Sequence, residues 1–340
     1  MDRALEAAWD EAKAEHGSRG DAVSKPMEAA RALCLRGGKR LRAALVVVGA
    51  QIGGGAEDWT PLLPVCSAVE LLQAYFLIHD DWMDGDDVRR GGPSVHAALE
   101  ESFPTPHLAA CGAVLAGDYT LALALRALSR VELASERWPA LLARFAELQL
   151  DAVVGQQLDV LGNGENLDEV YRLKTASYTV MGPLELGMIW ALGTQQRVEP
   201  ARRVGPTHAE LEMFAVPVGI AFQLRDDLIG ALADPRVSGK PRGSDLRAGK
   251  PSLLVNTALQ LSDAEGARSI REVFGNASAT DAEVARALRS IEASGAPSAV
   301  EARIDELSAQ AKAALGAPGF DDAARTSLEG VRVALVERVS

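Results

Sequence analysis

Cysteine and long apolar stretches are scarce in this sequence of 340 residues, and both absences exclude classes of protein. The three cysteines, Cys34, Cys66 and Cys111, are widely spaced and form no CxxC pair. Such spacing argues against a disulfide scaffold or a zinc site and favours a reducing compartment, so we expect a cytoplasmic location. No run of about 20 apolar residues is present, and the first residues lack the layout of a signal peptide, so we expect no membrane span.

Basic residues are too few to balance the acidic ones. The sequence has 35 Lys and Arg against 47 Asp and Glu, a net charge of −12 at pH 7. Such a chain is a poor binder of nucleic acids, because the phosphate backbone requires a basic surface. If the protein binds anionic ligands, local Lys and Arg clusters or metal ions must reverse the field.

Aromatic residues make up only 5% of the chain and convincing strand patterns are absent, whereas alanine, leucine and valine dominate the apolar residues. Alanine and leucine favour helices. Apolar residues recur with helical spacing in many segments, among them Leu62–Asp84, Pro106–Leu128, Trp138–Leu161, Asp168–Leu192 and His208–Leu232. No linker of different composition divides the chain. We therefore predict an all-α bundle of about ten or more helices in a single domain, residues 1–340.

The first candidate site lies at the end of an apolar segment, in the sequence HDDWMD at residues 79–84. Asp80 and Asp84 are four positions apart, so on a helix they share a face and repel each other. Divalent cations would offset this repulsion, and Mg²⁺ is usually held by one or two protein carboxylates together with substrate phosphates. A solvated acidic helix end is the alternative interpretation.

A second Asp-Asp pair, Asp226 and Asp227, ends another apolar segment in the sequence FQLRDDLIG at residues 222–230. Each acidic pair has a glutamine upstream, Gln73 for the first pair and Gln223 for the second. Either segment alone would also fit a surface helix end. Their recurrence favours a common chemical role.

Basic residues gather near both acidic segments, in GGKRLR (37–42), RRGG (89–92), KT (174–175), GK (239–240) and GK (249–250). Lys39 and Arg42 are three positions apart and share a helix face. Arginine and lysine are the usual phosphate binders. Each of these cations taken alone is more often a surface charge, but together they indicate a site for polyanions and metal.

Six ordered motifs resemble those of the trans-isoprenyl diphosphate synthases, or polyprenyl synthetases. They are GGKRLR, ELLQ…HDDWMD…RRGGPSVH, GQQLD, KT, FQLRDD and GK…SDLRAGK, and they run from Gly37 to Lys250. The resemblance implies an isoprenoid synthase bundle around a central cavity, typically in a homodimer. It also implies that isopentenyl diphosphate is joined to an allylic diphosphate with Mg²⁺, about three ions, Mn²⁺ being the alternative.

The resemblance also assigns roles to individual residues. Those that would bind metal are Asp80, Asp81, Asp84, Asp226 and Asp227. Those that would hold the allylic diphosphate are Arg89, Lys174 and Lys240. Those that would hold isopentenyl diphosphate are Lys39, Arg42, Gln73 and Arg90. Those that would line the reacting region are Gln156, Thr175 and Gln223, and Lys250 would help to close the loop over the second motif. The catalytic set implied is Asp80, Asp84, Asp226, Lys174 and Gln223.

The second motif departs from the family pattern, because Gly230 stands where a last aspartate is often found. Asp234 is a candidate to replace the missing carboxylate. This departure leaves the binding of the third metal ion open.

Tyr75 and Phe76 precede Asp80 by about one helical turn, or roughly 6–7.5 Å along the axis. A prenyl chain anchored at the metals would run past these rings, and in the family such bulk suggests farnesyl diphosphate as the product. Ordinary core packing of the two aromatics is the alternative.

Other products and functions stay open at this point. Geranyl or geranylgeranyl diphosphate would need only a different stop for the growing chain. A terpene cyclase of the same fold needs no second diphosphate site, so Lys39, Arg42 and Arg90 argue against it. A non-catalytic regulatory subunit would be expected to lose aspartates that this chain retains.

Overall fold

The computed structural model describes residues 1–340 except 56–57, 163, 165, 195–204, 233–241 and 338–340. In chain order its α-helices are α1 (Asp2–His16), α2 (Asp21–Leu35), α3 (Leu41–Ile52), α4 (Leu63–Asp84), α5 (Val95–Glu100), α6 (Pro106–Leu128), α7 (Trp138–Leu161), α8 (Leu167–Tyr171), α9 (Gly182–Thr194), α10 (His208–Leu232), α12 (Ser244–Ala248), α13 (Leu253–Leu261), α14 (Ala264–Val273), α15 (Asp281–Ala293), α16 (Ala296–Ala314) and α17 (Asp322–Val336). Two short 3₁₀ helices (Gly17–Arg19 and Thr60–Leu62) and a π-helical segment, η3 (Arg172–Met181), complete the helical part. Strand structure in the described ranges is confined to one antiparallel hairpin, β1 (Val88–Arg89) and β2 (Gly92–Pro93). The prediction of an all-α fold is confirmed.

The chain forms two compact units. Unit 1 comprises Met1–Arg144 and Pro183–Arg202, and unit 2 comprises Phe145–Gly182 and Arg203–Ser340. The single-domain organisation expected from the sequence stays a prediction.

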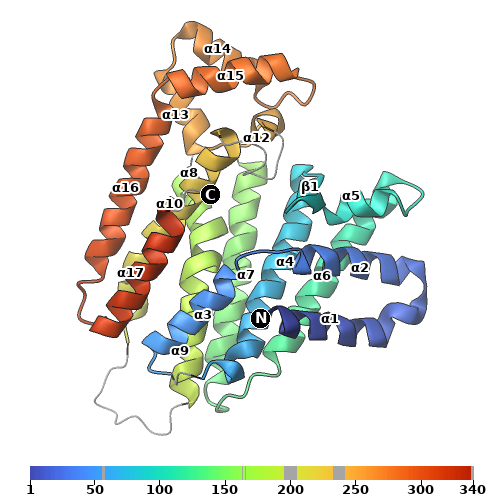
Figure 1. The fold of residues 1–340 in the computed structure, drawn as a ribbon, viewed down its shortest axis with the longest axis vertical. Coiled ribbons are helices and arrows are strands. Elements are labelled where there is room, and N and C mark those ends of the chain that lie inside the picture. The colour runs from blue at the N-terminus through green and yellow to red at the C-terminus, as the bar shows by residue number, and fades with distance from the viewer. Residues whose placement is uncertain (56–57, 163, 165, 195–204, 233–241, 338–340) are drawn as a thin grey trace. The chain divides into compact units, whose positions relative to one another are not determined.

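In unit 1, α4 carries the first acidic motif at its C-terminal end. All positions from Val65 to Ala74 are buried, and the helix lies beside α6 (Figure 1). A glycine permits this close approach, because a Cβ atom at Gly117 of α6 would lie 2.2 Å from Nε2 of His79. His79 Nε2 lies 3.0 Å from the carbonyl oxygen of Val114. Since His79 directly precedes Asp80, this packing fixes the rotation of α4 at the motif.

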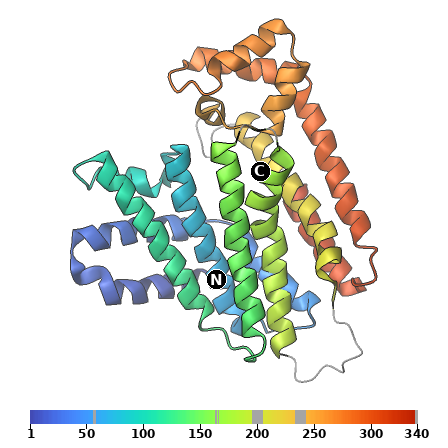
Figure 2. The same cartoon turned by 180° about the vertical axis from the view of Figure 1, so that it is seen from behind.

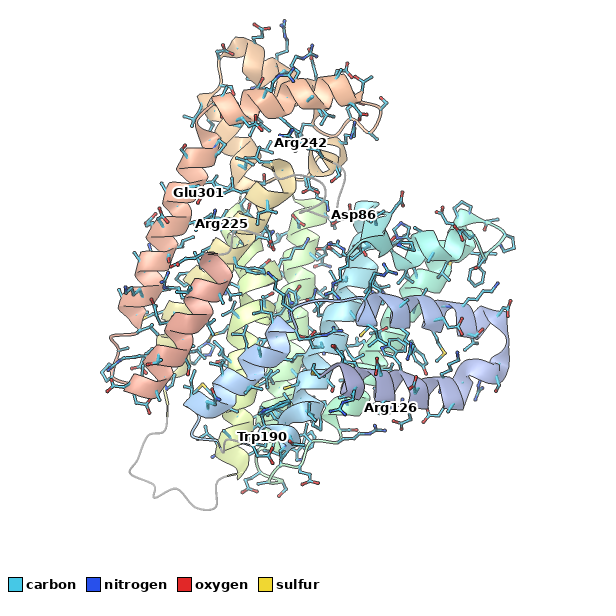
Figure 3. The ribbon with its side chains drawn as sticks, viewed as in Figure 1. Asp86, Arg126, Trp190, Arg225, Arg242 and Glu301 are labelled. Atoms are coloured by element: carbon cyan, nitrogen blue, oxygen red, sulfur yellow. The ribbon has the colours of Figure 1, made fainter. Side chains whose placement is uncertain are left out.

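In unit 2, α10 carries the second acidic motif and packs against η3 and α16. A Cβ atom at Gly219 would lie 2.4 Å from Cα of Ala176, so the glycine lets α10 approach η3 closely. Arg225, next to the motif, pairs with Glu301 of α16 (Figure 3). The arginine charge therefore serves the packing of α10 against α16. Beyond α13, α14 and α15 pack against each other (orange in Figure 2).

The segment predicted as one α-helix, Asp168–Leu192, is helical but not uniform. Its middle, η3, is π-helical, and it contains Lys174 and Thr175. The prediction of uniform α-helix was wrong because burial of η3 residues such as Leu173 and Val180 is compatible with either winding. Departures of this kind from α-helix occur frequently at functional sites.

Two helices in the described part of the chain, Thr60–Asp84 and Pro106–Leu128, have the length and hydropathy of membrane spans. In the first, 67% of the most apolar window is buried inside the protein, and in the second 44%. Core helices of soluble proteins meet the same criterion, so this observation is weak support for a span. The expectation of none stays a prediction.

Candidate active site

The residues singled out from the sequence lie in both units, and each unit is described by itself. Unit 1 holds Lys39, Arg42, Gln73, Tyr75, Phe76, Asp80, Asp81, Asp84, Arg89 and Arg90. Unit 2 holds Gln156, Lys174, Thr175, Gln223, Asp226, Asp227 and Lys250. Lys240 and Asp234 lie outside the described residues.

In unit 1 an arginine from the hairpin faces the first acidic motif. Nε of Arg89 donates to Oδ1 of Asp81 at 2.7 Å, and Nη2 lies 3.4 Å from Oδ2 of Asp86 and 3.8 Å from Oδ2 of Asp80. Asp86 lies between α4 and β1 (Figure 3). The hairpin therefore brings a cation back onto the carboxylates that end α4.

Burial and charge act against each other at this pair. Asp81 is fully buried, and burial raises the pKa of its carboxyl although the neighbouring Arg89 lowers it. For Arg89, burial alone would lower the pKa, but the carboxylates of Asp81, Asp80 and Asp86 raise it above its usual value. Asp81 and Arg89 therefore form a buried ion pair within the first motif.

The second carboxylate oxygen of Asp81 could accept a further positively charged group. Oδ2 of Asp81 is buried and has no hydrogen-bond partner among the described residues. The described ranges contain no group of three or more His, Cys, Asp or Glu side chains that could enclose a metal ion. A motif with few carboxylates fits Mg²⁺, which takes one or two of them together with phosphate oxygens and water.

Gln73 lies one turn after Glu70 on the buried face of α4. Its Oε1 is buried and has no hydrogen-bond partner within the described ranges. Rotation of the Gln73 amide group by 180° exchanges its oxygen and nitrogen atoms. Gln73 can therefore present an N–H donor to an oxyanion.

The two basic loops of unit 1 adjoin each other. Nη1 of Arg90 donates to the carbonyl oxygen of Gly37 at 3.2 Å, and Lys39 is exposed in the same loop as Gly37. The structure therefore brings together the GGKRLR and RRGG segments, which are about fifty positions apart in the sequence.

In unit 2 the second acidic motif is held by neutral donors. Nε2 of Gln223 donates to Oδ1 of Asp227 at 2.8 Å, and the hydroxyl of Tyr171 donates to Oδ2 at 2.9 Å. Thr175 donates in turn to Oε1 of Gln223 at 2.8 Å. The backbone N–H of Leu253 donates to the Tyr171 oxygen at 3.0 Å. One hydrogen-bonded chain therefore links α13, α8, α10 and η3.

This environment perturbs two titratable groups. Burial raises the pKa of Asp227 to about 7, against the lowering effect of the bonds from Gln223 and Tyr171. The negative charges of Asp245 and Asp159 raise it further. Burial and the neighbouring Asp227 also raise the pKa of the Tyr171 hydroxyl.

Lys174 lies in η3 and its Nζ is 2.5 Å from Oδ2 of Asp159 on α7. The two helices touch there through a glycine, since a Cβ atom at Gly155 would lie 2.4 Å from the backbone nitrogen of Lys174. Gln156, the next residue, has a buried Nε2 with no hydrogen-bond partner in the described part of the chain. The GQQLD motif therefore supplies both the close approach and the counter-charge for the lysine.

Sequence reasoning missed three residues of these arrangements. Asp159 and Asp245 stand inside motifs that were recognised, GQQLD and SDLRAGK, and could have been found there. Oδ2 of Asp245 lies 3.3 Å from the position that a Cβ atom would take at Gly230, so a carboxylate from α12 occupies the space beside this glycine. Tyr171 lies outside every motif that was recognised, and nothing in the sequence pattern identified it.

The two rings proposed to stop the prenyl chain contact each other. The ring centroids of Tyr75 and Phe76 are 5.0 Å apart, and the Tyr75 ring meets that of His79 edge-on at 4.7 Å. Both aromatics are partly exposed. They form a compact aromatic cluster in the turn before Asp80.

An all-α fold with two aspartate-rich segments near helix ends, each accompanied by cations and amides, indicates an enzyme of the class that acts on phosphorylated substrates. The comparison with known proteins identifies the family within that class. The chain matches the polyprenyl synthetase family over residues 24–291 and belongs to it.

Named relatives agree with this assignment. The chain is 31% identical over 273 residues to a short chain isoprenyl diphosphate synthase of Methanocaldococcus jannaschii, covering 79% of this chain and 76% of the relative. It is 36% identical over 287 residues to a geranylgeranyl diphosphate synthase of Mycobacterium tuberculosis, covering 82% and 75%. The fold is similar to that of geranylgeranyl pyrophosphate synthase from Corynebacterium glutamicum, crystallised with isoprenyl diphosphate and magnesium. That superposition has a TM-score of 0.88 at 31% identity and covers 99% of this chain and 97% of the other.

Proposed function

We propose that the protein joins isopentenyl diphosphate to an allylic diphosphate, dimethylallyl or geranyl, to give a short-chain trans-prenyl diphosphate. The observation that carries the proposal is the environment of the two acidic motifs. Each is a pair of adjacent aspartates in the last two turns of a helix. In each pair one carboxylate has polar partners described above, Arg89 for Asp81 and Gln223 with Tyr171 for Asp227. Membership of the polyprenyl synthetase family supports the reaction type.

In this proposal Mg²⁺, with Mn²⁺ as the alternative, supplies Lewis acidity that helps the allylic diphosphate to leave. Asp80, Asp84 and Asp226 hold the ions, with Asp81 and Asp227 beside them. Arg89 and Lys174 add fixed positive charge for the departing diphosphate. Both cations now contact carboxylates, Asp81 and Asp159, so binding of the diphosphate must compete with these pairs.

Lys39, Arg42, Gln73 and Arg90 hold the diphosphate of isopentenyl diphosphate in this proposal, so that its double bond is oriented toward the allylic cation. Orientation of two bound reactants supplies a large part of the rate in such reactions. Thr175 and Gln223 present oxygen atoms that stabilise developing positive charge. The proton lost after bond formation goes to the released diphosphate.

We propose farnesyl diphosphate as the main product, because Tyr75 and Phe76, in the turn before Asp80, would together obstruct a longer chain anchored at the first motif. Two of the relatives described above are geranylgeranyl synthases, which makes that longer product the principal alternative. The difference between the products rests on how far past the two rings the chain can grow.

The test is chromatography of the products that purified enzyme makes from isopentenyl diphosphate with each allylic primer. Tyr75→Ala and Phe76→Ala should give longer products than the wild type. Tyr119→Ala is the matched control, since Tyr119 stacks on Trp9 elsewhere in unit 1, and its products should be unchanged. Unchanged lengths in the first two variants would refute the proposed stop, and no chain growth by the wild type would favour a cyclase.

We also propose a homodimer. Exposed residues recur at alternating spacings of three and four along α6, namely Leu108, Cys111, Leu115, Asp118, Ala122 and Leu125. This is the spacing of a helix–helix seam, and a second copy of the chain would cover it. Sedimentation of the wild type and of Leu115→Glu tests the proposal, since the charge should shift the protein toward a monomer.

A further inference from the structure

The two basic loops of unit 1 have an unusual backbone. Among the described residues, the non-glycine residues with positive φ are Arg40 (47°) and Arg90 (53°), and both belong to these loops. Left-handed backbone is unfavourable for residues with a Cβ atom, because that atom crowds the following carbonyl oxygen. Such conformations persist only where the surroundings hold them, and they concentrate at functional sites.

Arg40 is held from three directions. Its Nε donates to Oδ1 of Asp2 at 2.8 Å, and its Nη1 donates to the carbonyl oxygen of Cys34 at 3.1 Å and to Oε2 of Glu70 at 3.4 Å. Cys34 lies in the last turn of α2, where helix carbonyls need partners from elsewhere. Only 13% of the Arg40 side chain is exposed, so its charge is directed inward and not toward a ligand.

Glu70 completes the arrangement from α4. Its Oε1 accepts the backbone N–H of Ala43 at 3.1 Å, and the whole residue is 5% exposed. Ala43 lies in the first turn of α3, whose capping residue, Arg40, makes no side-chain cap. Glu70 therefore caps α3 and neutralises Arg40 with the same carboxylate.

The hairpin is fastened to the loop as well. Nη1 of Arg36 donates to the carbonyl oxygens of Arg89 at 3.0 Å and Pro93 at 2.9 Å, while Arg90 donates to that of Gly37. Gly38 lies beside the Arg90 guanidinium, since a Cβ atom there would be 3.3 Å from Cζ of Arg90, and its φ of 110° favours glycine. The loop at 36–40 is thus fixed at both ends and against the hairpin.

We propose that Arg40 and Glu70 form a positioning pair that holds the 36–40 loop in the conformation in which Lys39, Arg42 and Arg90 receive the diphosphate of isopentenyl diphosphate. The inference rests on the assignment of those three cations made above. Glu70 precedes Asp80 by ten residues on α4, about 15 Å along the helix axis. The pair therefore sets the affinity for isopentenyl diphosphate and not the ionisation of the allylic substrate.

The test compares Glu70→Gln, which keeps an acceptor for the Ala43 N–H but removes the charge, with Arg40→Gly, which tolerates the positive φ but removes the clamp. In both variants KM for isopentenyl diphosphate should rise about tenfold, which corresponds to ~1.4 kcal/mol of binding. The kcat value and KM for the allylic substrate should stay near those of the wild type. Calorimetric titration with isopentenyl diphosphate alone should give the same loss of affinity without turnover.

Asp10→Asn is the matched control, because it breaks an exposed ion pair with Arg31 in the same unit (3.1 Å). Its KM values should equal those of the wild type. Unchanged affinity for isopentenyl diphosphate in folded Glu70→Gln and Arg40→Gly, with only a lower unfolding temperature, would overturn the positioning role. Arg42→Ala distinguishes the assigned diphosphate site from the positioning role of Arg40 and Glu70. If Arg42→Ala also leaves the affinity for isopentenyl diphosphate unchanged, the assignment of the diphosphate site is wrong. If Arg42→Ala weakens binding and the other two variants do not, only the positioning role is wrong.

Discussion

The two acidic motifs solve the same electrostatic problem in different ways. In unit 1, the buried carboxylate of Asp81 is matched by a full positive charge, Arg89, at 2.7 Å. In unit 2, Asp227 receives hydrogen bonds from two neutral groups, Gln223 and Tyr171. Burial raises the pKa at both positions, and among the described residues a cation pairs with the first carboxylate, whereas the partners named for the second are neutral.

Because their partners differ, Asp81 and Asp227 are expected to respond differently to pH although their sequence motifs are similar. Pairing with arginine opposes protonation of a buried carboxylate, because protonation would leave a buried guanidinium unpaired. A carboxylate held by neutral donors can bind a proton near pH 7, or exchange that proton for a metal ion. The first motif therefore contains a buried ion pair, whereas the second contains a carboxyl group that responds to pH and ligands.

The largest expected effect is on kcat, and it concerns the proposed role of both motifs in binding metal. Asp80→Asn and Asp226→Asn should each lower kcat by about a thousandfold, the upper range for loss of a group that stabilises a charged transition state. The measurement is steady-state turnover at saturating Mg²⁺, with the exposed Asp21→Asn as control. A large loss in one variant and a small loss in the other would mean that only one motif takes part in the reaction.

The next effect distinguishes the motifs by pH. Asp227 has a pKa of about 7 in the folded protein against an ordinary value of 3.8. Its stabilising contribution is therefore full below pH 3.8 and is lost as the pH rises through 7, because over that range the folded state binds more protons than the unfolded chain.

Thermal unfolding in a metal chelator tests this. Between about pH 5 and about pH 8, the unfolding temperature of the wild type should fall relative to that of Asp227→Asn. Parallel curves for the two proteins would show that Asp227 does not titrate in this range.

A smaller effect concerns Tyr171, which joins Asp227 to the start of α13. Tyr171→Phe removes a bond to a carboxylate and leaves the N–H of Leu253 without its acceptor, so the free energy of unfolding should fall by about 2 kcal/mol. Denaturant unfolding measures the change, and Tyr119→Phe is the control. A loss no greater than that of the control would mean that water replaces the hydroxyl at no cost.

The smallest effect concerns Asp245, whose charge raises the pKa of Asp227. Asp245→Asn should therefore shift the pH dependence of unfolding described for Asp227 to lower pH, by less than about one unit. An unchanged midpoint would show that the two carboxylates do not interact.

Much of this architecture could be predicted from the sequence, and the features that could not be predicted have identifiable physical reasons. Periodicity located α4 and α10, because burial of one helix face imposes a repeat that can be read directly. The first motif was recognisable because Asp80 and Asp84, four positions apart, share a helix face and need compensation, and the second because it repeats the Asp-Asp pair. The winding of η3 could not be predicted, since most of its residues are buried and leave no clear repeat that separates a π-helix from an α-helix.

Contacts between side chains of separate segments could not be predicted from the sequence either. The contact of Arg89 with Asp81 depends on the turn of the hairpin. The bond from Tyr171 to Asp227 depends on how α8 packs against α10, and the left-handed backbone of Arg40 depends on Glu70 from another helix. In each case the sequence pattern located at least one of the two residues in the contact, but not the contact itself.

The central claim is that the carboxylates of both motifs bind metal ions and diphosphate. A crystal structure of the protein soaked with Mg²⁺ and inorganic pyrophosphate tests it most directly. We expect ions bound by Asp80 and Asp84 and an ion bound by Asp226, and at each motif we expect the ions to contact pyrophosphate oxygen atoms. Pyrophosphate and ions bound at one motif, with the other motif contacting neither, would contradict it.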